Sequence, residues 1–297
     1  MEKKKCGFVA VVGKPNVGKS SLVNAMVGAK VSITGPKPQT TRNKILGIKT
    51  GDDYQIVFID TPGAIKPRNA LGEYMEKSIV AATVGIDALL IVLDATKITE
   101  RDFGLIEKYK SFKVPIFVCI NKTDIGKYED VYPKLERLNE LKFISEYVST
   151  SAKTGKGVDE LLNKLVNVLP YGEFMFDEDQ ITDRSLRFLA SEIVREKALI
   201  YLQEEIPHGI AVDIPKFEEY KSLVTIEAEI IASKPNHKQI IIGKGGDMLK
   251  KIGTSARVEI ESLLDKKVNL QLFVKVRENW QDSSLSLREF GYDKKDI

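Results

Sequence analysis

The first residues that could do chemistry form the stretch "GKPNVGKS" at positions 13–20. The apolar run 8–12 precedes it and "SSLVNAMVG" follows, so it should connect a strand to a helix. Glycines let backbone N–H groups and the helix N-terminus approach phosphate oxygens closely. In this pattern Lys19 reaches the β and γ phosphates and Ser20 binds Mg²⁺. This phosphate loop therefore predicts a bound nucleoside triphosphate rather than a simple turn. Its expected contacts are Gly13, Lys14, Pro15, Asn16, Val17, Gly18, Lys19, Ser20 and Ser21.

Two further polar segments, "NKTD" at 121–124 and "TSAK" at 150–153, each follow an expected strand. Ligands of open α/β sheets bind at the carboxyl ends of the strands, where both segments would lie. Together with the phosphate loop, these segments resemble those of the GTPases. The resemblance implies that Asp124 accepts hydrogen bonds from guanine, while Asn121 and Lys122 shape the pocket. The further base contacts it implies are Ser151, Ala152 and Lys153.

The γ-phosphate should be sensed by two mobile loops, at 31–43 and 60–75, which GTP would order. "DTPG" at 60–63 resembles the GTPase segment in which the aspartate, here Asp60, reaches Mg²⁺ through water, followed by Thr61, Pro62 and Gly63. The stretch "VSITGPKPQTTRN" at 31–43 has no period and is expected to be the first mobile loop. A threonine there would bind Mg²⁺ only when the γ-phosphate is present, and so order the loop. Thr40 and Thr41 are both candidates, and Thr41 is preferred.

Hydrolysis of a phosphoanhydride depends on positioning and charge neutralisation. Ras-like enzymes place a glutamine after this glycine, whereas here Gly63 is followed by Ala64. That departure resembles the GTPases with a hydrophobic residue at this position, in several of which a phosphate-loop asparagine helps to bind K⁺. Asn16 matches that asparagine, although such side chains also often bond only local backbone. The catalytic residues expected are Asn16, Lys19, Thr41 and Gly63, with slow turnover that K⁺ stimulates.

The elements that position these residues alternate between strand and helix over residues 1–170. Runs such as "ALLIVL" and "IFVCI" are apolar at successive positions, as in strands buried on both faces. Alternation of this kind predicts an α/β domain with a mostly parallel six-stranded sheet and helices on both faces. The strands are expected at 8–12, 45–49, 55–59, 89–93, 116–120 and 146–149, and the helices at 19–28, 70–83, 101–111, 131–141 and 158–168.

The pattern changes after residue 170, which predicts a linker at 171–181 and a second domain at 182–297. An amphipathic helix is expected at 182–205 with Asp183 as its cap. Strands at 209–214 and 223–232 follow, then a glycine loop, a helix at 247–264, a strand at 267–276 and a polar tail that Trp280 should anchor. The order helix, strand, strand, loop, helix, strand predicts an α+β domain.

The second glycine loop, Gly243–Gly246 in "IIIGKGGDMLKK", cannot be a copy of the phosphate loop. A second phosphate loop would need Gly-Lys at 248–249, where the chain has Met-Leu. The remaining pattern is G-x-x-G between an aliphatic run and a helix, which is the arrangement of a KH domain of type II. Such a loop clamps the backbone of about four single-stranded nucleotides.

Charge supports an RNA-binding role for this segment. The whole chain has a net charge of only +3, yet residues 234–251 contain five lysines and one acid, Asp247. Positive charge is thus concentrated where a phosphate backbone would lie. Bases are expected along an apolar face formed by residues 240–242 and by Met248 and Leu249. The RNA contacts expected are Lys234, Lys238, Ile242, Gly243, Lys244, Gly245, Gly246, Met248, Lys250 and Lys251.

The overall composition is that of an ordinary globular protein. A chain of 297 residues with 43% hydrophobic and 29% charged residues is long enough for two domains. Cys6 and Cys119 are too few and too far apart for a disulfide framework or a metal site, and Cys119 should be a small buried residue. Neither a signal peptide nor a membrane span is expected.

Over essentially its whole length the sequence resembles the Era family of bacterial GTPases. The residues that carry the resemblance are "GKPNVGKSSLVN", "PQTTR", "DTPG", "NKTD", "SAK", "ITDRSLRFLASEIVREK" and "IIIGKGGDMLKKIG". It implies a ribosome-assembly factor that binds the 3′ end of 16S rRNA in the maturing small (30S) ribosomal subunit. It also implies a cytoplasmic location with peripheral association at the cell membrane, and we expect a monomer. The alternatives are a GTPase with another structured-RNA partner, such as a tRNA-modification assembly, and a passive RNA-binding module with a structural nucleotide.

Overall fold

Aliphatic runs form the strands of a six-stranded sheet in the N-terminal half of the computed structural model, which describes residues 4–64 and 66–293. Some predictions reach beyond the described residues. They concern the first residues of the predicted N-terminal domain (1–3), the last residues of the predicted C-terminal domain (294–297), and position 65 of the expected second mobile loop (60–75). In chain order the strands are β1 (Lys5–Val12), β2 (Ile45–Thr50), β3 (Tyr54–Asp60), β4 (Ala88–Asp94), β5 (Ile116–Asn121) and β6 (Glu146–Ser149).

The strand order is β2-β3-β1-β4-β5-β6, and only β2 runs antiparallel, since it forms a hairpin with β3. The prediction of a mostly parallel sheet is therefore confirmed. In a parallel sheet the carboxyl ends of the strands share one edge. The segments that follow β1, β3, β5 and β6 consequently meet there, and all four carry predicted nucleotide contacts.

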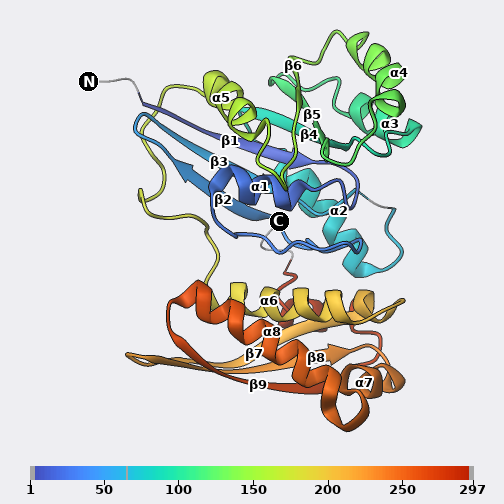
Figure 1. Cartoon of the computed structure of the whole chain (residues 1–297), viewed down its shortest axis with the longest axis vertical. Helices are drawn as coiled ribbons and strands as arrows, with labels where there is room; N and C mark the ends of the chain where they lie inside the picture. Colours follow the sequence, from blue (N-terminus) through green and yellow to red (C-terminus); the bar gives the residue numbers. More distant parts are fainter. Residues whose placement is uncertain (1–3, 65, 294–297) are drawn as a thin grey trace.

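Helices cover both faces of this sheet (Figure 1). One apolar core joins α1 and α5 to the sheet, and a second core joins α2, α3 and α4 to the other face. Cys6 and Cys119 are both buried free thiols, as expected for Cys119. The helices are α1 (Lys19–Val27), α2 (Ala70–Ala82), α3 (Glu100–Lys108), α4 (Tyr128–Asn139) and α5 (Val158–Val168).

The C-terminal half contains a three-stranded sheet of order β7-β8-β9, in which β7 and β8 are antiparallel and β8 and β9 parallel. Helices α6 and α8 pack on one face of it, and α6 lies between this sheet and the N-terminal domain (Figure 1). The elements are α6 (Leu186–Tyr201), η1 (Ile206–Gly209), β7 (Ile210–Glu219), β8 (Leu223–Ala232), α7 (Pro235–Ile242), η2 (Lys244–Gly246), α8 (Asp247–Leu264) and β9 (Lys267–Val276).

Two predictions for this half are wrong. Residues 235–242 form helix α7, whereas we expected only an aliphatic run before the glycine loop. Helix α6 begins at Leu186 and its cap is Ser185, whose hydroxyl accepts a hydrogen bond from the Phe188 N–H. Asp183 instead accepts one from the Leu46 N–H at 3.3 Å, and so contacts β2 rather than its own helix.

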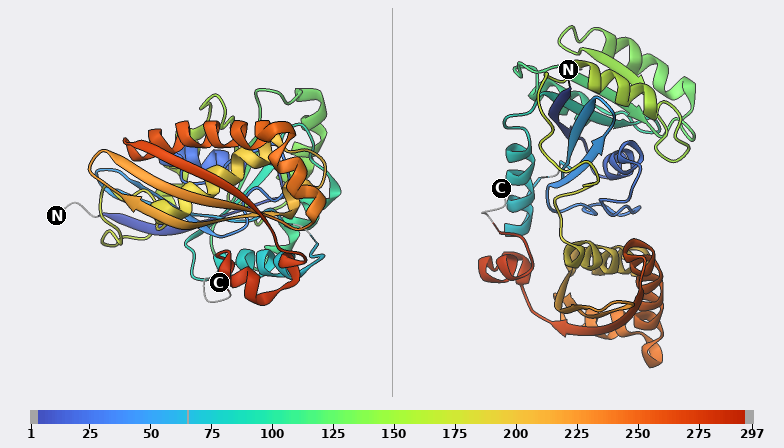
Figure 2. Two further views of the ribbon diagram at one scale, coloured as in Figure 1. Left: turned by 90° about the horizontal axis from the view of Figure 1, so that it is seen from below. Right: turned by 90° about the vertical axis from the view of Figure 1, so that its left-hand side faces the viewer.

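The tail after β9 returns to the N-terminal domain, where η3 (Trp280–Asp282) and α9 (Ser284–Glu289) lie beside α2 (Figure 2). Trp280 is fully buried in a core with Leu71 and Met75 of α2, and its indole N–H donates to the Gly209 carbonyl at 2.9 Å. The expectation that Trp280 anchors the tail is confirmed.

Candidate nucleotide site and second glycine loop

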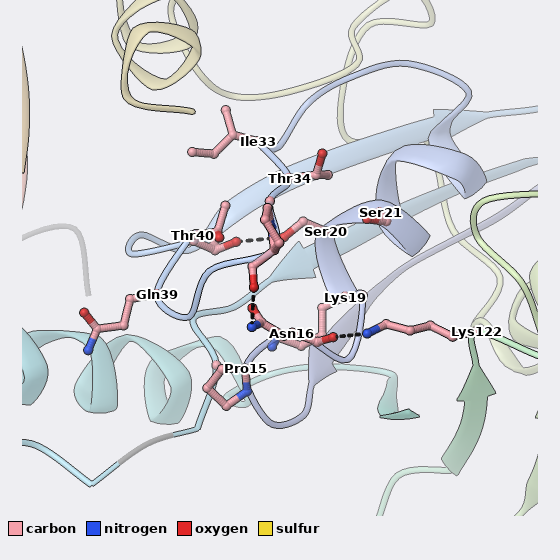
Figure 3. Close-up of a pocket in the computed structure, with 15 residues that line it drawn as sticks. Pro15, Asn16, Lys19, Ser20, Ser21, Ile33, Thr34, Gln39, Thr40 and Lys122 are labelled. Atoms are coloured by element: carbon pink, nitrogen blue, oxygen red, sulfur yellow. Dashed lines mark hydrogen bonds between the residues drawn. The ribbon is translucent and has the colours of Figure 1, made fainter. Parts of the chain in front are cut away.

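The phosphate loop connects β1 to α1, and its last glycine caps the helix. Gly18 has φ +94°, and a Cβ built there would lie 2.3 Å from the Asn121 side-chain nitrogen. Only glycine suits this conformation and this close approach. Helix α1 therefore begins at Lys19 with its N-terminus beside a cavity of about 370 Å³ (Figure 3). Free N–H groups and the helix dipole make this end of the cavity attractive to phosphate.

Lys19 is 6% exposed and its ammonium group is held by the phosphate loop itself. It donates hydrogen bonds to the carbonyls of Gly13 at 3.2 Å and Lys14 at 3.0 Å. Burial lowers the pKa of Lys19 to about 8, and the charge of Asp60 opposes this shift. The lysine is thus poised to gain a strong electrostatic partner when phosphate enters the cavity.

Three oxygen-bearing side chains converge next to Lys19. The Ser20 hydroxyl lies 2.7 Å from the Thr41 hydroxyl and 2.7 Å from one Asp60 oxygen. Asp60 is fully buried, burial raises its pKa, and among the described residues its other oxygen has no hydrogen-bond partner. Thr40 instead donates to the Lys37 carbonyl at 2.7 Å. Hydroxyl and carboxylate oxygens are the ligands that Mg²⁺ prefers, so this set fits the ion.

Asn16 and Gly63 both line the same cavity. The Asn16 side-chain NH₂ donates to the Pro36 carbonyl of the first mobile loop at 2.8 Å, and the Asn16 backbone carbonyl accepts a hydrogen bond from the Lys122 ammonium group (Figure 3). A Cβ at Gly63 would lie 2.7 Å from the Pro15 backbone, so that position requires glycine. Both mobile loops therefore contact the phosphate loop directly.

The two predicted base-contacting segments are joined to the phosphate loop by Asn121. Its side chain donates to the Val17 carbonyl at 3.0 Å and accepts from the Ala152 N–H at 3.0 Å. Ser151 donates to Asp124 at 2.8 Å, and Asp124 is exposed to solvent. The structure thus brings both predicted segments beside the phosphate loop and leaves a carboxylate available to a base.

Some cavity residues were not singled out as contacts from the sequence. They all come from the first mobile loop: Ile33, Thr34, Gly35, Pro36 and Gln39. The absence of a repeating hydrophobic pattern in this loop indicates mobility, but it does not predict which of its residues face the cavity. Conversely, the Lys14 side chain turns away to Asp102 at 2.5 Å, and the Thr61 hydroxyl donates to the Val11 carbonyl at 2.7 Å. The predicted contacts that line the cavity are Pro15, Asn16, Gly18, Lys19, Ser20, Ser21, Thr41, Gly63 and Lys122. The other predicted contacts, including the base-contacting residues Asp124, Ser151, Ala152 and Lys153, do not line it.

The second glycine loop has a different shape. Gly243, Gly245 and Gly246 all have positive φ, and Gly246 caps α8. A Cβ at Gly245 or Gly246 would meet no atom within 4 Å. These two positions therefore face open space, into which the N-terminus of α8 is directed. That is the geometry expected for an extended anionic chain rather than a compact one.

The predicted basic surface is present around this loop. Lys234, Lys244, Lys250 and Lys251 are exposed and Lys238 is half-buried. The predicted apolar face is smaller than expected, because Ile241 is fully buried in the core of the domain. Ile240 remains exposed, and Ile242, Met248 and Leu249 are half-buried against that core.

Comparisons with known proteins agree with these two sites. The model of the family described as 50S ribosome-binding GTPase matches residues 8–122, and the KH domain model matches residues 205–281. GTPase Era of Clostridium acetobutylicum is 46% identical over 97% of this chain and 98% of its own length. GTPase Era of Clostridium botulinum, strain Alaska E43, is 47% identical over 98% of this chain and 99% of its own length.

None of the helices within residues 4–64 and 66–293 is long and apolar enough to span a membrane.

Two solved structures are similar over nearly the whole chain. A crystal structure of Era in complex with MgGDPNP and nucleotides 1506–1542 of 16S ribosomal RNA has a TM-score of 0.93 at 42% identity, covering 97% of this chain and 99% of the other. A variant of Aquifex aeolicus Era bound to GDP.AlF4⁻ has a TM-score of 0.91, with the same identity and coverage. With the relatives above, these similarities establish that the chain belongs to the Era family of GTPases, which combine a GTPase domain with a KH domain.

Proposed function

We propose that this protein hydrolyses GTP to switch the binding of its KH domain to the 3′ end of 16S rRNA in the small ribosomal subunit. The observation that carries the proposal is the presence of two different glycine loops, one enclosed beside Lys19 and one open beside α8. The related complex with MgGDPNP and 16S rRNA nucleotides supports the choice of both ligands. We further propose that the protein acts as a cytoplasmic monomer that associates peripherally with the membrane.

At the nucleotide site, the backbone of the phosphate loop and Lys19 would hold the β and γ phosphates. Ser20 and Thr41 would hold Mg²⁺ directly and Asp60 through water, which their mutual distances of 2.7 Å support. The ion would neutralise charge that develops on the phosphates. Asp124 would accept the guanine N–H groups. Because Gly63 is followed by Ala64, no glutamine orients the attacking water, and we propose slow intrinsic turnover.

Asn16 is the side chain that we propose as a ligand of K⁺. Its NH₂ group is already committed to the Pro36 carbonyl, which leaves its side-chain oxygen to face a cation. Positive charge at this position would supply part of what an arginine finger supplies elsewhere.

Coupling between the sites would run through the mobile loops 31–43 and 60–75, which GTP orders. The test is RNA binding by fluorescence anisotropy, using a labelled 3′-terminal 16S rRNA oligonucleotide and a shuffled control of equal length. We expect tighter binding with a GTP analogue than with GDP, and at least about tenfold weaker binding after Gly245→Asp combined with Gly246→Asp, since carboxylates would repel phosphate. Equal affinity for both RNAs would contradict the assigned target. A turnover assay on the same protein tests the enzymatic half, and no GTP hydrolysis would leave a passive RNA-binding module.

A further inference from the structure

The residues on both sides of Thr41 form hydrogen bonds with the C-terminal domain. The carbonyl of Thr40, which belongs to the peptide unit entering Thr41, accepts a hydrogen bond from Arg195 of α6. The residue that follows is Arg42, whose side chain crosses into the C-terminal half. Because each peptide unit is planar, fixing the Thr40 carbonyl also fixes the direction of the Thr41 N–H.

Arg42 is 1% exposed and donates to groups far away in the sequence. Its guanidinium bonds the carbonyl of Ile210 at 2.7 Å, the carbonyl of His208 at 3.2 Å and the Tyr292 hydroxyl at 3.3 Å. It also lies 5.8 Å from the centre of the Trp280 ring. The segment at the start of β7 and the C-terminal tail therefore both contact the Arg42 side chain and fix its position.

The burial of Arg42 is energetically unusual. Among the described residues it forms no ion pair, and its Nε has no hydrogen-bond partner. Arg195, by contrast, is neutralised by Glu192, which it contacts at 2.6 Å through two nitrogens. A buried cation that forms no direct ion pair is costly, and local costs of this kind are expected at functional sites.

The rest of the first mobile loop is fixed to the same helix. The Thr34 N–H donates to the carboxylate of Glu196 at 2.8 Å, and Lys37 donates to the Leu202 carbonyl that ends α6. Glu196 is itself 2% exposed and paired with Lys30 at 2.6 Å. The loop that carries Thr41 is thus attached to the C-terminal domain along its length, with the two arginines nearest the threonine.

We propose that Arg42 and Arg195 form a cross-domain clamp that positions Thr41 for Mg²⁺ and the γ-phosphate, so that the C-terminal domain completes the hydrolytic site. The proposal rests on the proposed function of Thr41 and extends it to two positioning residues. Coupling is reciprocal: a domain that stabilises the ordered loop must also respond when GTP orders that loop. The clamp is the physical contact through which nucleotide state would reach the KH domain.

The test compares Arg42→Ala with a matched control, Arg184→Ala, in the full-length protein. Arg184 also spans the two halves, since it donates to the Lys44 carbonyl and lies 4.9 Å from the Phe188 ring, but it does not flank Thr41. For Arg42→Ala we expect single-turnover GTP hydrolysis to slow about tenfold and the Mg²⁺ concentration for half-maximal rate to rise several-fold. GDP affinity should stay within about twofold, because Thr41 binds Mg²⁺ only when a γ-phosphate is present. Arg184→Ala should behave as wild type in all three measurements.

A second variant, Glu192→Met combined with Arg195→Met, removes the other half of the clamp together with its ion-pair partner, so that neither member of this pair is left as an unpaired buried charge. It should reproduce the same pattern, and retained GDP affinity reports that each variant is folded. The ratio of RNA affinities with GTP analogue and with GDP should fall toward one in both clamp variants, which a merely structural arginine would not cause. Unchanged hydrolysis and Mg²⁺ dependence in both, or equal losses in Arg184→Ala, would overturn the proposal. If wild type itself fails to hydrolyse GTP, the proposed function fails instead.

Discussion

The buried ammonium group of Lys19 makes a quantitative prediction about pH. Burial holds its pKa at about 8 in the nucleotide-free protein. A bound triphosphate favours the charged form and raises that pKa, so binding takes up a proton above pH 8. From this value, Lys19 is about nine-tenths charged at pH 7 and about one-tenth charged at pH 9. The dissociation constant for a GTP analogue should therefore rise about tenfold between pH 7 and pH 9, with little change below pH 7.

The assay is a titration with a fluorescent GTP analogue at fixed Mg²⁺ and ionic strength from pH 6.5 to pH 9. Lys19→Arg provides the control, because a guanidinium stays charged throughout this range. That variant should bind with a different affinity but an almost flat pH dependence. An unchanged wild-type dissociation constant up to pH 9 would refute the argument, since Lys19 would then be fully charged in the free protein. Equal slopes in wild type and Lys19→Arg would assign the titration to another group.

Three further outcomes follow from the site and the tail. Thr41→Ala should slow GTP hydrolysis about tenfold or more and raise its Mg²⁺ requirement, whereas Thr40→Ala should change neither by more than about twofold; the reverse order would exchange their roles. Replacing Na⁺ in the buffer with K⁺ should raise the GTP turnover of the wild type but not that of Asn16→Ala. Equal wild-type rates in both salts would remove K⁺ from the mechanism. Trp280→Ala should lower the free energy of unfolding by about 3–5 kcal/mol in urea denaturation, because a fully buried indole is lost, and a loss under 1 kcal/mol would contradict its anchoring role.

Much of the sheet was predictable because its strands are apolar on successive residues, and such runs suit few other environments. β4 is one residue longer at each end than the expected strand 89–93, and β5 is one residue longer at its carboxyl end than the expected strand 116–120. Helix α7 was missed because residues 240–242 are also aliphatic on successive positions. Its signal was Pro235 in the first turn after Lys234, a position that proline favours.

Contacts between the two halves could not be predicted from local patterns. The Arg42 guanidinium bonds the carbonyl of Ile210, a backbone atom whose availability depends on the path of another domain. The choice between Thr40 and Thr41 was open for the same reason, since it depends on which hydroxyl the rest of the loop turns toward Ser20. Side-chain types and spacing identify the chemistry of a loop, whereas its direction is set by tertiary contacts.

The two loops use glycine for different structural reasons, although both contain glycine and lysine. In the phosphate loop the space beside the glycine is taken by protein: a Cβ at Gly13 would lie 2.5 Å from the Val92 carbonyl, and one at Gly18 would meet Asn121. There glycine allows the loop to close, so the backbone encloses a compact ligand. At Gly245 and Gly246 the corresponding space is empty, so glycine keeps a surface clear. Adding a methyl group should therefore displace neighbouring atoms in the first loop. In the second loop it should meet no neighbouring atom, but it would strain a backbone of positive φ and obstruct a partner that approaches from solvent.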